Sequence, residues 1–168
     1  MSVAGTLVVG LGNRMRGDDA VGLEVASALS AARPDLDVHA HEREPIDLIE
    51  LWAGAEEVIV VDAVAGGDPG RIHRLDGLDV GLAWERSAPA SSHAMHLGQV
   101  IELARTLGRL PGRMTVIAVE GADFATGSEP SPRVLAAARA VATELAGSVR
   151  TTHDPGGAAR IDPPVGAA

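Results

Sequence analysis

Residues 58–64 of the chain read VIVVDAV, and this stretch decides the fold class. Every position except Asp62 is apolar, and valine and isoleucine predominate. A run that is apolar at consecutive positions is typical of a strand in a parallel sheet, with both faces of the sheet covered. Two other stretches share the pattern, TLVVGL at residues 6–11 and MTVIAV at residues 114–119. Weaker strands are expected at residues 36–41 and 71–75.

Helical patterns lie between these strands. Apolar residues recur at intervals of three and four over residues 19–32, 45–53, 93–107 and 131–146. Strands that alternate with helices predict right-handed crossovers and a three-layer α/β/α domain with a mostly parallel sheet. We expect this domain to span residues 1–147. Residues 148–168 contain several prolines and glycines and few apolar anchors, which predicts a disordered tail.

The composition excludes several classes of function. The chain has 168 residues, enough for one domain with a sizeable core, and a net charge of −9, which disfavours nucleic acid as a partner. It has no cysteine, so disulfides, thiolate metal sites and cysteine nucleophiles are excluded. It also has no lysine, which excludes Schiff-base and P-loop lysine chemistry. The start of the chain shows no signal peptide or membrane span, so we expect a cytoplasmic protein with no membrane partner. We also expect a monomer.

Functional sites of parallel sheets form at the carboxyl ends of the strands, and the first loop there reads GLGNRMRGDDAVG over residues 10–22. A dinucleotide-binding fingerprint needs glycine where Met15 stands, so the phosphate-binding interpretation fails. What remains is a tight turn followed by Asp18 and Asp19 at the start of a helix. One interpretation is structural, with Asp18 capping the helix and Asp19 complementing its dipole. The other interpretation is that these acids belong to a functional site.

Asp62 interrupts the apolar strand of residues 58–64. An unpaired buried carboxylate costs several kcal/mol, so this side chain needs a partner or a cation. The structural alternative is that Asp62 begins a loop and accepts hydrogen bonds from nearby backbone amides.

The third loop reads SSHAMHL over residues 91–97. Ser91 or Ser92 is expected to cap the following helix, which places His93 in its first turn. The helix dipole there favours neutral imidazole, the state that binds metals, although a histidine at this position can also be purely structural. His96 is a second candidate, one helical step further and expected to be more exposed.

Asp19, Asp62 and His93 therefore come from three loops at one predicted sheet edge. Two carboxylates and one imidazole suit a divalent ion such as Ni²⁺, Zn²⁺ or Mn²⁺, and three protein ligands leave a position open for water or substrate. Other hydrolytic signatures, such as G-x-S-x-G and H-E-x-x-H, are absent.

Most of residues 5–147 resemble the nickel–iron hydrogenase maturation endopeptidases. The resemblance rests on GLGN at residues 10–13 with DDAVG at 18–22, on VVDAV at 60–64, and on Ser92-His93 with the helix that follows. It implies a five-stranded α/β/α sandwich in which Asp19, Asp62 and His93 contact the metal and carry the catalysis. It also implies that the protein removes a short C-terminal extension from the nickel-loaded hydrogenase large subunit, which then closes around its active site.

Two features depart from the family pattern or add to it. Residues 41–47, HEREPID, stand where many members have a Gly-Gly-Thr-like loop. The sequence therefore leaves open which hydrogenase large subunit is recognised. Glu120 and Asp123 follow the last strand, where they either line a substrate groove or are solvated loop charges.

Several alternatives stay open on the sequence alone. The metal is expected to be nickel supplied by the substrate, although the sequence does not distinguish this from a metal held by the enzyme. Hydrolysis is metal-assisted or aspartic-type, with a carboxylate or a metal-polarised water as the attacking group and no acyl-enzyme. A non-catalytic nickel-sensing checkpoint or chaperone for the large subunit could share the fold. A nucleotide-binding module is disfavoured by Met15 and the acids at the helix start.

Overall fold

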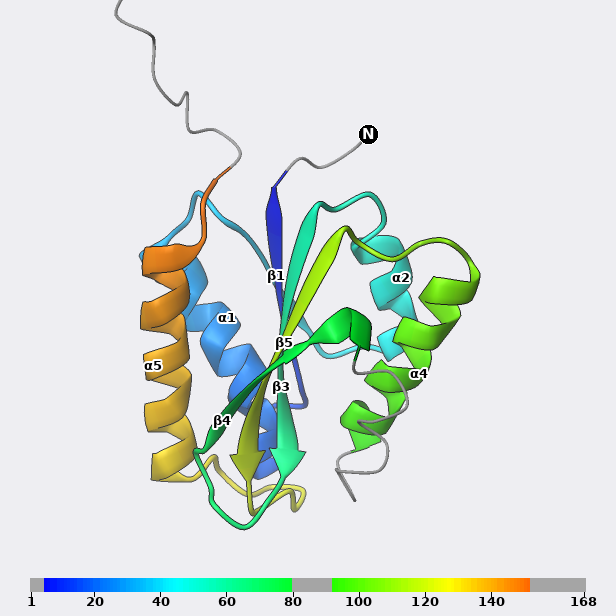
Figure 1. Cartoon of the computed structure of the whole chain (residues 1–168). Coiled ribbons are helices and arrows are strands. Elements are labelled where there is room, and N and C mark those ends of the chain that lie inside the picture. Colours follow the sequence, from blue (N-terminus) through cyan, green and yellow to red (C-terminus); the bar gives the residue numbers. More distant parts are fainter. Residues whose placement is uncertain (1–4, 80–91, 152–168) are drawn as a thin grey trace, which may run out of the picture.

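The computed structural model describes residues 5–79 and 92–151, with only the backbone for residues 92–96. The described part is a five-stranded sheet with helices on both faces (Figure 1). The strands are β1 (Thr6–Leu11), β2 (Asp37–His41), β3 (Glu57–Ala65), β4 (Ile72–Asp76) and β5 (Arg113–Gly121). The helices are the 3₁₀ helices η1 (Gly17–Ala20) and η2 (Pro45–Asp47) and the α-helices α1 (Val21–Ala32), α2 (Leu48–Leu51), α4 (Ser92–Thr106) and α5 (Pro132–Ser148).

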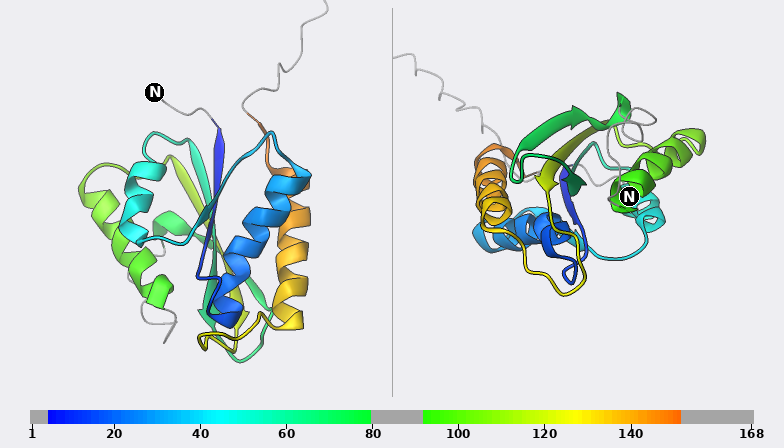
Figure 2. Two further views of the ribbon diagram at one scale, coloured as in Figure 1. Left: turned by 180° about the vertical axis from the view of Figure 1, so that it is seen from behind. Right: turned by 90° about the horizontal axis from the view of Figure 1, so that it is seen from below.

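The strand order is β2-β1-β3-β5-β4, and only β4 runs antiparallel to its neighbour. The connection from β3 to β4 is too short for the crossover that would bring β4 back parallel to β3 and β5, so β4 runs in the opposite direction along the free edge of β5. Helices α1 and α5 cover one face of the sheet, and α2 and α4 cover the other (Figure 2). The predicted three-layer α/β/α class and the five predicted strands are confirmed. The expected helix over residues 19–32 is divided, because the chain passes through η1 before α1 begins.

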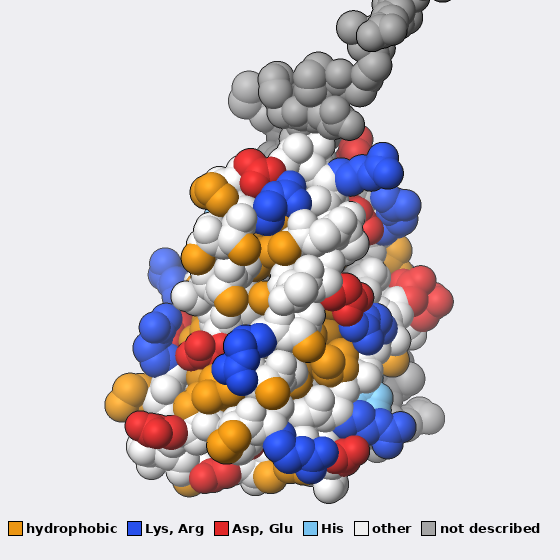
Figure 3. All heavy atoms as spheres, turned by 90° about the vertical axis from the view of Figure 1, so that its left-hand side faces the viewer, with side chains coloured by type: hydrophobic (Ala, Val, Ile, Leu, Met, Phe, Trp, Pro, Cys, Tyr) orange, Lys and Arg blue, Asp and Glu red, His pale blue; other side chains and the backbone are white. Residues whose placement is uncertain are grey.

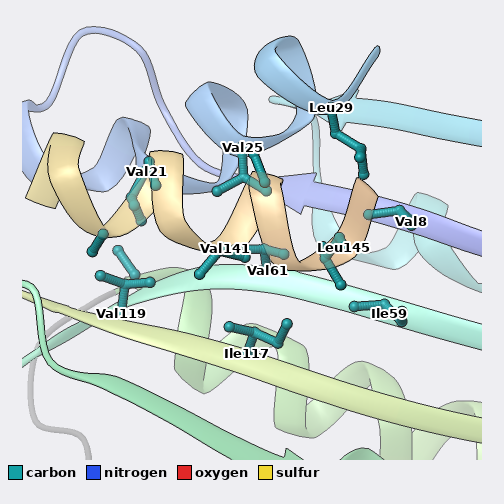
Figure 4. Packing of buried hydrophobic residues seen from close by; sticks show 14 of the residues in the cluster. Val8, Val21, Val25, Leu29, Ile59, Val61, Ile117, Val119, Val141 and Leu145 are labelled. Atoms are coloured by element: carbon teal, nitrogen blue, oxygen red, sulfur yellow. The ribbon is translucent and has the colours of Figure 1, made fainter. Parts of the chain in front are cut away.

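Each face of the sheet has its own hydrophobic core. The core under α1 and α5 is shown in Figure 4 and includes Val8, Val21, Val25, Leu29, Ile59, Val61, Ile117, Val119, Val141 and Leu145. The core under α2 and α4 includes Leu7, Val9, Leu48, Trp52, Val58, Val60, Leu97, Ile101 and Val116. Side chains alternate between the two faces along a strand. Asp62, two positions after Val60, therefore lies on the α2 and α4 face.

Glycines allow α1 to sit directly on the sheet. A Cβ atom on Gly22 would lie 2.1 Å from the carbonyl oxygen of Leu11 and 2.5 Å from that of Val61. A Cβ atom on Gly10 would lie 1.9 Å from the carbonyl oxygen of Gly22. Such distances are far below van der Waals contact, so only glycine fits at both positions. The start of α1 is thereby fixed against β1 and β3.

The carboxyl end of the domain lies beyond Gly147. Ser148 is the last residue of α5, and the following Val149 is buried in the core under α1 and α5. The Arg33 guanidinium donates hydrogen bonds to the carbonyl oxygens of Ala146 and Val149, at 2.6 and 3.4 Å. Ser148 therefore continues α5, and Val149 packs with the domain two residues beyond the expected boundary after residue 147. The expected disorder of the remaining tail stays a prediction, because residues 152–168 lie outside the described part.

The surface on the α5 side mixes acidic, basic and hydrophobic side chains, without a large area of one kind (Figure 3). Ion pairs join neighbouring elements there, among them Arg74 with Glu144 and Arg133 with Asp68. Within residues 5–79 and 92–151, no helix has the length and apolar character that crossing a membrane requires.

Candidate active site

Asp19 lies in η1, which packs against β3 and against α1. Its side chain is 1% exposed. The backbone N–H of Asp19 donates to the carbonyl oxygen of Arg16 at 3.1 Å, and its carbonyl oxygen accepts from the N–H of Asn13 at 3.2 Å. A Cβ atom on Gly12 would lie 2.0 Å from the same carbonyl oxygen, so the turn closes tightly on η1. These contacts fix the backbone that carries the Asp19 carboxylate.

Asp62 is fully buried within β3, opposite Ala118 of β5. Its Oδ1 accepts a hydrogen bond from the N–H of Ala63 at 2.8 Å. The interpretation that Asp62 begins a loop is wrong, since β3 continues to Ala65, although the hydrogen bond to a nearby amide is present. The last paired residues of β1 and β3 are Gly10 and Val61, so Asp62 lies just where β1 turns away toward η1. Asp19 and Asp62 therefore come from two elements that pack together at the carboxyl edge of the sheet.

The backbone of His93 lies in the first turn of α4. Figure 1 places this end of α4 at the edge toward which β3 and β5 point. The side chains of Ser92, His93 and His96, and all of Ser91, lie outside the described part, so the predicted cap and the predicted imidazole contact stay predictions. Among the side chains that the structure describes, no group of three or more histidines, cysteines and acids is placed to hold a metal ion.

The neighbouring acid, Asp18, has a structural role. Its Oδ1 accepts hydrogen bonds from the N–H and the hydroxyl of Ser131, and its Oδ2 accepts from the N–H groups of Ala122 and Asp123, at 2.7–3.1 Å. Burial raises the pKa of this carboxyl, but the four hydrogen bonds favour the carboxylate and hold the pKa below its usual value. The prediction that Asp18 caps its own helix is wrong, because neither η1 nor α1 begins with a side-chain cap. Asp18 instead holds the residue that precedes α5.

Comparison with known proteins decides the family. The family model described as hydrogenase maturation protease matches residues 43–148, which is more than half of the chain. The chain belongs to the hydrogenase maturation protease family. The matched segment contains Asp62 and His93 and begins after Asp19.

Solved structures of similar proteins carry the same fold as this protease. The hydrogenase maturating endopeptidase HybD from E. coli has a TM-score of 0.69 and 21% identity, over 83% of this chain and 88% of that chain. HycI from Thermococcus kodakarensis, a [NiFe] hydrogenase maturation protease, has a TM-score of 0.62 and 25% identity, over 84% and 90%. The hydrogenase 2 maturation peptidase from a Thaumarchaeota archaeon has a TM-score of 0.56 and 30% identity, over 83% and 94%. No curated protein sequence matches significantly. Because the chain belongs to the hydrogenase maturation protease family, it is a peptidase.

Glu120 of the protease holds the connection between β3 and β4. Its Oε1 lies 2.7 Å from Nε2 of His73, and its Oε2 accepts from the N–H of Asp68 at 2.8 Å. The hydrogen bond with His73 and then that from Asp68 lower the pKa of Glu120 despite the opposing effect of burial. Glu120 is thus a mostly buried residue of β5 and not a solvated loop charge, and its expected place in a substrate groove stays a prediction. Asp123 is exposed, and its Oδ1 accepts from the N–H of Ala125 at 3.0 Å, as a solvated loop charge would.

Residues 41–47 of the protease lie beside the loop that leads to Asp19. The N–H of Gly12 donates to the carbonyl oxygen of His41 at 3.3 Å. The N–H of Arg14 donates to Oε1 of Glu42 at 3.2 Å. The segment that is expected to differ from the family pattern therefore contacts the loop that leads to the candidate site.

Proposed function

We propose that this peptidase removes a C-terminal extension from the nickel-loaded large-subunit precursor of a nickel–iron hydrogenase. We further propose that Asp19, Asp62 and His93 contact the nickel that the precursor carries. One observation carries the proposal. Two carboxylates, 1% and 0% exposed, come from the packed elements η1 and β3 at the carboxyl edge of the sheet. The helical turn that bears His93 is at the same edge.

The chemistry of the donors fits nickel. Carboxylate oxygens and a neutral imidazole nitrogen bind divalent first-row ions, and burial of two carboxylates favours a cationic ligand. The set has no thiolate, because the chain has no cysteine, so its affinity for a free ion is modest. A modest affinity suits a metal that arrives already bound to the substrate.

The residues would act by positioning and by proton transfer. Contacts from Asp19, Asp62 and His93 to the metal of the precursor orient the scissile peptide bond against the carboxylates. One carboxylate, as general base, accepts a proton from the attacking water as the water oxygen adds to the carbonyl carbon, and the same group then returns this proton to the amide nitrogen as the C–N bond breaks and the amine product leaves. The bound nickel supplies polarisation of the carbonyl or of the water in the metal-assisted form of this reaction.

Recognition of the precursor would involve the segment 41–47, which contacts the loop leading to Asp19. We infer that its sequence helps to select the large subunit that is processed. A cytoplasmic, monomeric protease would suit this role, because it acts on a precursor before the hydrogenase is assembled.

The test is the intact mass of a nickel-loaded precursor before and after incubation with the protein, with nickel-free precursor as the control. Loss of a C-terminal peptide from the loaded precursor alone supports the proposal. Tight binding without a mass change supports the non-catalytic checkpoint instead. Equal cleavage of both precursors would show that nickel does not direct the reaction.

A further inference from the structure

The Arg16 guanidinium lies beside the Asp19 carboxylate. Nη1 of Arg16 is 3.8 Å from Oδ2 of Asp19, and the two side chains are 30% and 1% exposed. The Nε–H of Arg16 donates to the carbonyl oxygen of Phe124 at 3.3 Å. The cation is thus held between η1 and the loop that follows β5, with part of its surface in contact with water.

A guanidinium in this position opposes the binding of a free metal ion. It stays protonated throughout the pH range of proteins, so its charge is permanent. An ion that approaches Asp19 is repelled by this charge and competes with it for the same carboxylate. The whole chain carries a net charge of −9, which attracts cations in general. Arg16 opposes this attraction locally, because it places a positive charge beside the candidate site.

We propose that Arg16 makes metal contact at Asp19 conditional on the substrate. In the free protease, the Arg16 guanidinium lies beside the Asp19 carboxylate and disfavours the binding of dissolved Ni²⁺ there. When the precursor docks, the contacts of the whole large subunit supply the free energy that displaces Arg16, and the nickel takes its place. Arg16 acts through Asp19 and is a positioning residue. The inference rests on the function proposed above, because it takes Asp19 to be a contact of the nickel.

The test measures Ni²⁺ binding to the full-length protein by titration calorimetry, without precursor. We expect weak binding by the wild type and at least about tenfold tighter binding by Arg16→Met, a change of about 1.4 kcal/mol. Arg16→Lys, which keeps a positive charge, should retain the weak binding. Arg14→Met is the matched control, since Arg14 also follows the turn but pairs with Glu42 and is 66% exposed. It changes the net charge equally and should leave the affinity within about twofold of wild type.

The gain in Ni²⁺ affinity that Arg16→Met produces must depend on Asp19. Adding Asp19→Asn to Arg16→Met should return the affinity to the wild-type level or below. Melting curves establish that each variant folds, and Arg16→Gln, which still donates to Phe124, replaces Arg16→Met if the latter does not fold. Equal affinities of wild type and Arg16→Met, equal tightening by Arg14→Met, or a gain that survives Asp19→Asn would each overturn the inference. Failure of the proposed function is distinguishable, because it shows as wild-type protein that leaves nickel-loaded precursor uncut.

Discussion

The carboxylate of Asp18 accepts hydrogen bonds from both the N–H and the hydroxyl of Ser131, at 2.7 and 2.8 Å, across 113 positions of sequence. This contact joins η1 to the start of α5. The next residue, Asp19, pairs instead with Arg16 at the candidate site. Two adjacent acids therefore make different contacts, with Asp18 bound to the residue that precedes α5 and Asp19 beside the Arg16 guanidinium.

Asp18→Asn should lower the free energy of unfolding by about 1–3 kcal/mol, because an amide cannot accept hydrogen bonds from all the donors that surround this side chain. Urea denaturation at neutral pH measures the loss. Asp123→Asn is the control, since its exposed side chain accepts a hydrogen bond from the N–H of the nearby Ala125, and its effect should stay within about 0.5 kcal/mol. Equal losses in the two variants would show that the contacts of Asp18 carry no special stability.

The same carboxyl makes the stability depend on pH. Its pKa in the folded protein is lowered, so its contribution is fully present above the unfolded value of about 3.9 and is lost as the pH falls through the folded value. The difference in unfolding free energy between wild type and Asp18→Asn should therefore be constant from neutral pH to about pH 5 and shrink below about pH 4. Urea midpoints over this range measure it. A difference that grows on acidification would contradict the assigned direction.

Gly22→Ala should destabilise the fold severely, because the added methyl group would meet two backbone carbonyl oxygens at 2.1 and 2.5 Å. Overpacking of this kind costs about 1–3 kcal/mol or more. Gly147→Ala is the matched control, since nothing lies within 4 Å of its Cβ position in α5, and it should be neutral or stabilise by up to about 1 kcal/mol. Thermal melting compares them, and similar melting temperatures would refute the close approach of α1 to the sheet.

Truncation separates the domain from the tail. A chain ending at Gly147 loses the buried Val149 and an acceptor for Arg33, and should lose about 1–2 kcal/mol of stability. A chain ending at Thr151 should stay within about 0.5 kcal/mol of the full chain, because the composition of the remaining tail offers no apolar stripe. Chemical denaturation of both truncated chains decides whether Val149 anchors the end of the domain.

The sequence predicts local features of this protein well and long-range ones poorly. The run at residues 58–64 identifies β3, since a short segment that is apolar at consecutive positions is typical of a strand buried on both faces, and it singles out Asp62 as the one polar member. The partner of Asp18 was not predictable, because Ser131 is 113 positions away and nothing in the local sequence marks the contact. The packing of Val149 was not predictable for a similar reason, since only the folded chain brings Arg33 to the end of α5.

Asp19, Asp62 and His93 should behave as one unit if they contact one ion. Asp19→Asn or His93→Ala should remove most of the cleavage, and a double variant should be little worse than either single variant. A purely structural role predicts that Asp19→Asn loses at most about 1 kcal/mol of dipole stabilisation and stays active. Cleavage rates and melting curves measured together separate the two cases.

Asp62→Asn tests the shared site most directly. The substitution keeps the volume of the side chain and an oxygen that can accept from the N–H of Ala63, and it removes only the charge that a metal ion requires. The measurement is the intact mass of nickel-loaded large-subunit precursor over time, with wild type and variant both shown to be folded. We predict that wild type releases the C-terminal peptide and that Asp62→Asn does so at least about a hundredfold more slowly. Cleavage by folded Asp62→Asn at close to the wild-type rate would contradict the proposed site.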